Sequence, residues 1–144
     1  MSKIEISLQI RESYLSNPVE LKLDNQWDRS TLGKNAKQIG IYIIFTQKPE
    51  RCIYIGKTRG NQMDFATRLY RHATEAASQN GKVYRKLNEI CHNEPEKAIN
   101  VALITSDDVK NHFNIINNDL SESAMIDILE QVLIHYMHPE IQDT

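Results

Sequence analysis

Two short runs of β-branched and aromatic residues constrain the fold of this 144-residue chain more than any other feature. The first run, residues 40–45, reads GIYIIF, and the second, residues 52–56, ends in YIG. The connection between them, residues 46–51, is polar and contains a proline. Two such runs joined by a short polar connection predict a β-hairpin.

Strand geometry assigns the side chains of this hairpin to faces, because successive side chains point to opposite sides of a sheet. One face of the first strand carries Ile41, Ile43 and Phe45, and one face of the second strand carries Cys52, Tyr54 and Gly56. Tyr42 lies opposite the first set, with Gly40 on its own face. A glycine beside a phenol leaves room for another group to approach the backbone. Taken alone, this pattern fits two ordinary strand tyrosines as well as it fits a functional site.

The composition, with 40% hydrophobic and 25% charged residues, is that of a globular protein of one domain. No apolar run approaches the roughly 20 residues that a membrane-spanning helix requires, and the N-terminus lacks a secretory signal core. Cys52 and Cys91 are isolated and have no CxxC spacing, which argues against a zinc site. These features predict a cytoplasmic protein without a membrane partner.

Charge is unevenly distributed along the chain. Residues 57–86 contain seven basic and two acidic side chains, a net charge of +5, whereas residues 105–144 contain one basic and eight acidic side chains, a net charge of −7. A basic segment directly after the hairpin can meet the phosphates of a nucleic acid, while the acidic segment fits a solvated surface. The residues predicted to bind nucleic acid are Arg59, Arg71, Lys82, Arg85 and Lys86.

Short strands and amphipathic helices are predicted around the hairpin. The further strands are expected at 3–11, 19–24 and 98–104, and helices at 64–77, near 83–90 and at 121–137. The two N-terminal strands form either a hairpin or a pair of edge strands. A loop is predicted at 25–38, anchored by Trp27, and residues 105–120 are polar and poorly patterned, with a helical turn expected near Asp107–Asn111. We therefore expect a single α+β domain, with a strand extension over 1–37 and a core over 38–144.

The helix at 64–77, which Asp64 can cap, has two distinct stripes at helical spacing. The apolar stripe is Phe65, Leu69, Ala73 and Ala76, and the polar stripe is Arg68, Arg71, His72 and Glu75. For the last helix, Asp119 and Glu122 resemble a capping box. Its apolar face is predicted to contain Met125, Ile128, Leu129, Val132, Leu133 and Tyr136.

Glu130 is the most informative residue of the last helix, because Ile126 and Ile134 lie one turn before and after it. A carboxylate flanked in this way lies at the edge of buried surface, where an unpaired charge is costly. Glu130 is therefore expected to pair with a base such as Arg68, to hold a cation, or to do both in different states.

The combination of these residues resembles the GIY-YIG nuclease superfamily over residues 38–142. The resemblance is carried by Gly40-Ile41-Tyr42, Tyr54-Ile55-Gly56, Lys57, Arg68, His72 and Glu130. It implies a central antiparallel three-stranded sheet flanked by helices, with the N-terminal β extension added to it. It also implies Mg²⁺-dependent or Mn²⁺-dependent hydrolysis of phosphodiester bonds in DNA.

The resemblance also implies a role for each of these side chains. Glu130 would be the protein ligand of the metal, since magnesium often takes one or two carboxylates with phosphate oxygens and waters. Arg68 would bind the scissile phosphate with its planar set of donors. Tyr42 or Tyr54 would be the general base or position the water, with Lys57 or the metal favouring the phenolate. His72 would hold or relay a proton.

Three functions remain open from the sequence. The first is a compact DNA endonuclease acting on double-stranded or structured DNA, with its N-terminal strands or a homodimer providing recognition. The second is a catalytically weak DNA-binding module that depends on a partner, and the third is a buried polar network without catalysis. Family members commonly carry an asparagine after the glutamate helix, and here Gln142 stands in that region. The preference for DNA over RNA and the identity of the base are not fixed by the sequence.

Overall fold

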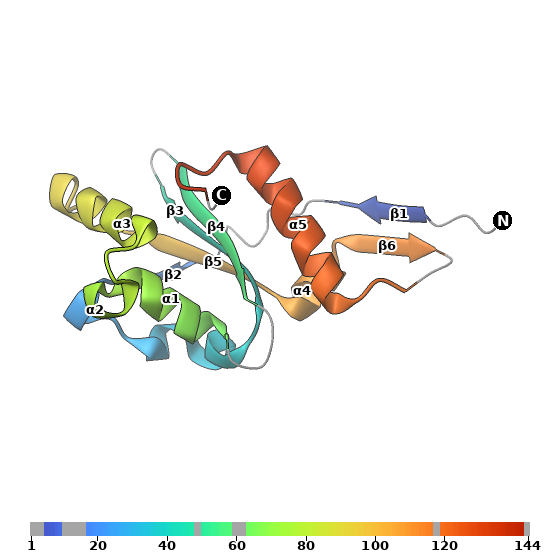
Figure 1. Ribbon diagram of the computed structural model, residues 1–144, viewed down its shortest axis with the longest axis horizontal. Coiled ribbons are helices and arrows are strands. Elements are labelled where there is room, and N and C mark those ends of the chain that lie inside the picture. The colour runs from blue at the N-terminus through green and yellow to red at the C-terminus, as the bar shows by residue number, and fades with distance from the viewer. Residues whose placement is uncertain (1–4, 10–16, 48–49, 59–62, 117–118, 143–144) are drawn as a thin grey trace.

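The computed structural model describes residues 5–9, 17–47, 50–58, 63–116 and 119–142. An antiparallel four-stranded sheet has helices on both faces: α5 covers one face, and α1 and α3 cover the other (Figure 1). The strands lie in the order β2-β5-β3-β4, so that β4 is an edge strand. The α+β class is therefore confirmed. No helix in the described part of the chain is long and apolar enough to cross a membrane.

The described residues form β-strands, α-helices and 3-10 helices. The strands are β1 (Glu5–Leu8), β2 (Val19–Glu20), β3 (Gly40–Thr46), β4 (Arg51–Thr58), β5 (Asn100–Thr105) and β6 (Phe113–Ile116). The α-helices are α1 (Phe65–Ala73), α2 (Glu75–Ser78), α3 (Lys82–Asn93), α4 (Ser106–Lys110) and α5 (Glu122–Met137). The 3-10 helices are η2 (Asp24–Gln26) and η3 (Arg29–Lys37).

Strands β3 and β4 form the predicted hairpin, and its two faces bury separate clusters of apolar side chains. Ile41, Ile43 and Phe45 pack beneath α5, whereas Tyr42 and Ile44 pack beneath α1 and α3. The assignment of faces on β3 is thus confirmed. β3 is fully buried because it pairs on both sides, with β4 and with β5.

The prediction that Cys52 shares a face with Tyr54 was wrong. The pairing shifts by one residue within the hairpin, since Ile44 lies opposite Tyr54 while Phe45 lies opposite Cys52. The extra residue, Ile53, forms a β-bulge, which reverses the alternation along β4. Cys52 consequently packs with the cluster beneath α5, and Tyr54 with the other cluster.

The two motif glycines are explained by what lies against them. Gly40 has a φ of 153°, and a Cβ there would overlap the backbone carbonyl oxygen of Ile104 on β5. Gly56 lies directly opposite Tyr42 in the ladder, and a Cβ there would overlap the phenol of Tyr42. The group that approaches the backbone of Gly56 is therefore the neighbouring tyrosine itself.

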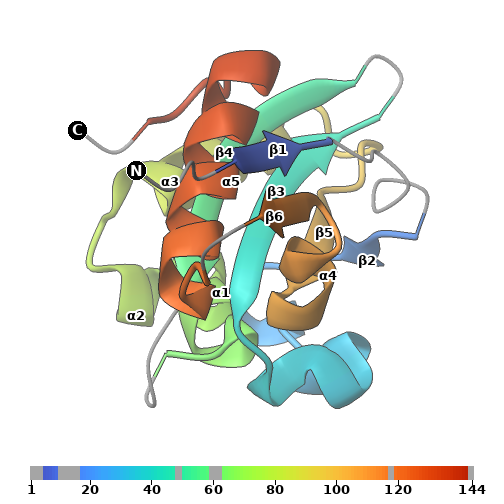
Figure 2. The same cartoon turned by 90° about the vertical axis from the view of Figure 1, so that its right-hand side faces the viewer.

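The N-terminal strands do not form a hairpin with each other. β2 pairs with β5 through Val19 and Glu20, which extends the expected three-stranded sheet to four strands. β1 pairs with β6 in a separate two-stranded sheet on the α5 side of the molecule (Figures 1 and 2). β6 lies in the poorly patterned segment 105–120, where no strand was predicted, whereas α4 confirms the helical turn expected there. Leu8, Phe113 and Ile115 of this small sheet pack against the cluster beneath α5.

Several helix boundaries differ from the predictions. Asp64 caps α1 as expected, by accepting from the amide of Thr67 at 2.8 Å, but the helix ends at Ala73, and Ala76 is exposed. Ser121, rather than Asp119, caps α5. Ile128 and Tyr136 are exposed, so that the buried face of α5 is rotated from the predicted one toward Ile126 and Glu130.

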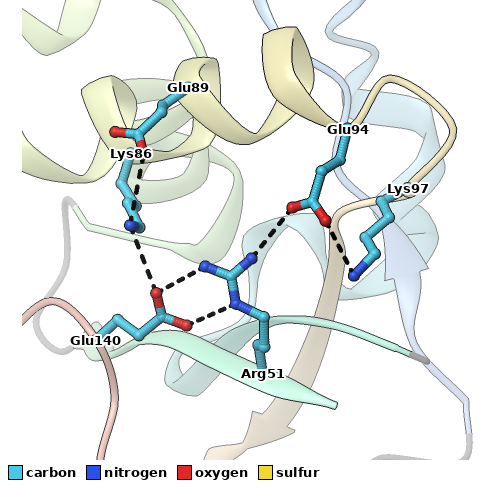
Figure 3. Close-up of polar contacts among 6 residues, drawn as sticks. All are labelled: Arg51, Lys86, Glu89, Glu94, Lys97 and Glu140. Carbon is cyan, nitrogen blue, oxygen red and sulfur yellow. Dashed lines mark hydrogen bonds and ion pairs between the residues drawn. The ribbon is translucent and has the colours of Figure 1, made fainter. Parts of the chain in front are cut away.

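The C-terminal segment runs along the outer edge of β4. The amides of Glu140 and Ile141 donate to the carbonyls of Cys52 and Ile53 at 3.0 and 2.9 Å. The guanidinium of Arg51 donates two hydrogen bonds of 2.8 Å to the Glu140 carboxylate. Figure 3 shows the wider cluster of ion pairs, which consists of Arg51, Lys86, Glu89, Glu94, Lys97 and Glu140. These contacts join the C-terminal segment to both β4 and α3.

Glu140→Gln is expected to lower the free energy of unfolding by about 1 kcal/mol at pH 7, since a bidentate but partly exposed pair is lost. The hydrogen bonds from Arg51 hold the pKa of Glu140 below its usual range. Because the folded pKa is depressed, this stabilisation is complete above the ordinary carboxyl pKa of about 4.3 and disappears as the pH falls through the lower folded value. Urea unfolding between pH 7 and pH 3 should show the two proteins converging in acid.

Glu89→Gln is the matched control for this measurement, because Glu89 is largely exposed and its contact with Lys86 is 3.8 Å long. This variant should match the wild type throughout the pH range. A deficit of Glu140→Gln that is equally large at pH 7 and pH 3 would show that the ion pair does not stabilise the segment.

Candidate active site

Two tyrosines and a histidine form a compact cluster beneath α1. The hydroxyl of Tyr42 lies 2.9 Å from Nε2 of His72, within hydrogen-bonding distance. The ring of Tyr54 packs edge-on against that of His72, with centroids 5.2 Å apart, and its centroid lies 6.0 Å from that of Tyr42. Tyr42 is fully buried and Tyr54 nearly so, whereas His72 is half-buried at the surface of the cluster.

Local structure explains why these side chains meet. Phe65, Leu69 and Ala73 fix α1 on the sheet, which places His72 of the last turn over the hairpin. Tyr42 on β3 lies opposite Gly56 on β4, where the missing side chain leaves space for the phenol. The cluster thus depends on a glycine on the neighbouring strand as much as on its own members.

A second cluster lies on the opposite face of β4, beneath α5. The ammonium of Lys57 is 2.8 Å from Oδ1 of Asp127 and 3.3 Å from Oε1 of Glu130. Glu130 is 7% exposed, which confirms its predicted position at the edge of buried surface. The hydrogen bond to Asp127 and the nearby Glu130 carboxylate hold the pKa of Lys57 above its ordinary value, although partial burial opposes this. Lys57 is therefore a cation and not a base.

The predicted site residues thus form two clusters rather than one. Gly56 and Lys57 are adjacent on the edge strand β4, so that one faces the phenols and the other faces the carboxylates. Both clusters lie at the same end of this strand. The expectation that Lys57 stabilises a phenolate is not supported, because its ammonium binds the two carboxylates, while a phenol hydroxyl contacts His72.

Arg68 lies on the phenol side and does not pair with Glu130, whose ion-pair partner is Lys57. Its Nε is buried without a hydrogen-bond partner among the described residues. Arg68 and His72 both line an open groove of about 590 Å³, which lies along α1, α2 and the start of α3. The residues that line this α1–α3 groove are Arg68, Arg71, His72, Ala77, Ser78, Gln79, Gly81, Lys82, Val83 and Tyr84.

The residues predicted to bind nucleic acid lie in different parts of the structure. Arg71 and Lys82 line the α1–α3 groove, and Arg85 is exposed on α3. Lys86 instead belongs to the ion-pair cluster around Glu140. Arg59 lies outside the described residues. Gln142 directly follows the residue that bonds Ile53, and it is exposed.

The donors around Glu130 are suited to a hard divalent cation. Both contacts of Glu130, from Lys57 and Gln131, are made to Oε1, which leaves Oε2 without a partner among the described residues. Asp127 provides a second carboxylate one turn earlier. Three metal-binding side chains do not gather anywhere in the described part of the chain. A single carboxylate with waters and phosphate oxygens is nevertheless a common magnesium environment.

The predictions missed Asp127, although its position three residues before Glu130 placed both carboxylates on neighbouring turns of one helix. Cys52 and Cys91 are free, half-buried cysteines. Burial raises the pKa of Cys52 to about 12 and also raises that of Cys91, so that both remain thiols at neutral pH.

Comparison with known proteins identified no relative: no protein-family model, no curated protein and no solved structure matches this chain.

Proposed function

We propose that this protein is a divalent-metal-dependent endonuclease that hydrolyses phosphodiester bonds in DNA, in the manner of the GIY-YIG nucleases. One observation supports this most: Tyr42, Tyr54 and His72 come together on one face of β4, while Lys57, which directly follows Gly56, contacts Glu130 on the other face. Acid–base groups on one side and a cation-binding carboxylate on the other are the components that phosphodiester hydrolysis requires.

On the phenol side, the group accessible to a reacting water is His72, because Tyr42 is fully buried. In the neutral imidazole one ring nitrogen accepts a proton. In the proposed state Nε2 carries the ring hydrogen and donates it to the hydroxyl oxygen of Tyr42, 2.9 Å away, which fixes the orientation of the ring, and Nδ1 is the nitrogen that accepts a proton from the water. His72 is thus the proposed proton acceptor at the groove, and Tyr42 acts through it. The ring of Tyr54 also packs against that of His72, with its centroid 5.2 Å away.

Arg68 is the proposed phosphate ligand. Its Nε is buried and has no hydrogen-bond partner within the described ranges, and Arg68 lines the groove together with His72. A planar set of donors matches two oxygens of a phosphate, and it stabilises the negative charge that grows during attack. Arg68 therefore binds the phosphate next to the proton acceptor.

Glu130, with Asp127 beside it, would hold the metal, which supplies electrophilic stabilisation of the phosphate charge and of the leaving oxygen when bound. The ammonium of Lys57 contacts both carboxylates, at 2.8 Å for Asp127 and 3.3 Å for Glu130.

A second function, DNA binding without cleavage, is favoured by one specific observation. Lys57 contacts both carboxylates and already neutralises part of their charge. If Lys57 remains there in solution, the protein binds DNA but needs a partner or a rearrangement to cleave it.

Plasmid cleavage in Mg²⁺ or Mn²⁺ tests the proposal. The wild type is expected to convert supercoiled plasmid to nicked or linear DNA. Chelation of the metal by EDTA is expected to abolish this cleavage. Arg68→Ala is expected to lower the rate about a hundredfold, the usual effect of losing a donor to transition-state charge. Lys110→Ala, which removes an exposed charge on α4, is the matched control and should cleave at the wild-type rate.

Equal background nicking by the wild type and Arg68→Ala would refute the proposal that this protein is an endonuclease. Salt-sensitive DNA binding would in that case support the non-cleaving module, and its absence would support a purely structural network.

A further inference from the structure

The α1–α3 groove contains three basic side chains that have no ion-pair partner in the described parts of the chain. They are Arg68 and Arg71 of α1 and Lys82 of α3. Among the residues that the structure describes, no aspartate or glutamate lines the groove. By contrast, Lys57 pairs with Asp127 and Glu130, and Lys86 pairs with Glu140. An unmatched group of cations around a groove is suited to an anionic ligand.

The backbone adds donors to the same groove. Helix α3 begins at Lys82, and its N-cap, Gly81, provides no side-chain hydrogen bond. Gly81, Lys82 and Val83 all line the groove. The first amides of a helix are unsatisfied within it and favour negative charge. They reinforce the three cationic side chains, two of which come from a different helix.

The groove is continuous with the phenol cluster. His72, which lies 2.9 Å from the hydroxyl of Tyr42, also lines the groove, as does the proposed phosphate ligand Arg68. The α5 side of the molecule differs in charge, because α4 and α5 together carry five acidic side chains and one basic side chain. A polyanion that reaches the site is therefore attracted on the α1–α3 side and repelled on the α5 side.

We propose that the α1–α3 groove binds the phosphate next to the scissile one on the same nucleic-acid strand, through Arg71, Lys82 and the first amides of α3. The backbone of the substrate then leaves the site across α1 and α3 and not across α5. This inference rests on the proposed function, since it takes the phosphate at Arg68 as the scissile one. It also separates the basic residues by role: Arg71 and Lys82 bind the substrate, whereas Lys86 holds the C-terminal segment.

The salt dependence of DNA binding tests this inference. Full-length Glu130→Gln serves as the parent, because it is not expected to cleave, and a labelled duplex oligonucleotide is titrated by fluorescence anisotropy at several salt concentrations. Arg71→Ala and Lys82→Ala should each lower the slope of log affinity against log salt by about 1, and the double variant by about 2. Both side chains are exposed, so that the fold should persist, as unfolding curves will show.

Lys86→Ala and Lys110→Ala remove the same charge elsewhere and should leave the slope unchanged. An equal loss of slope for Lys86→Ala and Lys82→Ala would overturn the inference, because the whole basic surface would then be acting non-specifically. No measurable binding by the parent would also overturn it.

Cleavage by the wild type, measured in parallel, distinguishes this inference from the proposed function. If the wild type cleaves DNA and the salt slopes of Arg71→Ala and Lys82→Ala are unchanged, phosphate binding by the groove is refuted. The proposed endonuclease activity then still holds. If the salt slopes of the two variants are reduced but the wild type does not cleave DNA in Mg²⁺ or Mn²⁺, the proposed endonuclease activity is refuted. The groove is then supported as a phosphate-binding surface.

Discussion

Glu130→Gln is expected to reduce plasmid cleavage by about three orders of magnitude, which corresponds to about 4 kcal/mol of transition-state stabilisation. The substitution preserves the size of the side chain and one carbonyl oxygen, but it removes the charge that attracts a divalent cation. The protein should remain folded, because Lys57 keeps its 2.8 Å contact with Asp127. The free energy of unfolding is expected to change by no more than about 1 kcal/mol.

Metal binding gives a readout that does not depend on activity. Mn²⁺ titration followed by electron paramagnetic resonance should show at least a tenfold weaker affinity for Glu130→Gln than for the wild type. Glu122→Gln is the matched control, since it changes an exposed glutamate on the same helix. Unchanged cleavage and Mn²⁺ affinity in Glu130→Gln would exclude Glu130 as the metal ligand.

The position of Glu130 could be predicted because helix geometry is local. Its neighbours one turn away are isoleucines, and this alone places the carboxylate at a buried edge, as found. Its partner could not be predicted in this way, because Lys57 comes from a distant strand. The sequence nevertheless contained a relevant signal: Lys57 follows Gly56 directly, so strand alternation already placed its side chain on the face opposite the phenols.

The elements that were missed depend on pairing between distant segments. The four residues of β6 have no strong strand pattern, and they become a strand because β1 pairs with them. β2 lies within the strand predicted at 19–24, but only two of its residues pair, and they pair with β5. The bulge at Ile53 has no glycine or proline to mark it. On α5, apolar residues surround much of the helix, so that helical periodicity did not determine which of them face the sheet.

The motif glycines show how a sequence pattern and its physical cause can differ. The pattern suggested open space beside each tyrosine for an approaching group. For Gly56 that space is filled by the ring of Tyr42, which the ladder places directly opposite. Gly56 is therefore required for the phenol cluster to form, and unfolding measurements on a Gly56 variant can test this.

Gly56→Ala is expected to lower the free energy of unfolding by about 3 kcal/mol. In an ordinary strand position this change would be mildly favourable, since glycine costs about 0.5–1 kcal/mol there. Here the new methyl group would overlap Oη and Cζ of Tyr42. The ring is fully buried between β4 and His72, so that it cannot swing into solvent. Cleavage should fall as well, because the displaced phenol would no longer hold His72.

The cause of this loss can be isolated by changing Tyr42, because the overlap involves particular ring atoms. Tyr42→Leu removes the distal ring atoms, so adding Gly56→Ala to it should cost less than about 1 kcal/mol. Tyr42→Phe keeps Cζ in place, and Gly56→Ala should therefore remain nearly as costly in that background as in the wild type. Urea unfolding of the six proteins gives both coupling energies. If Gly56→Ala costs the same beside leucine as beside phenylalanine, the penalty arises from the strand backbone and not from the phenol.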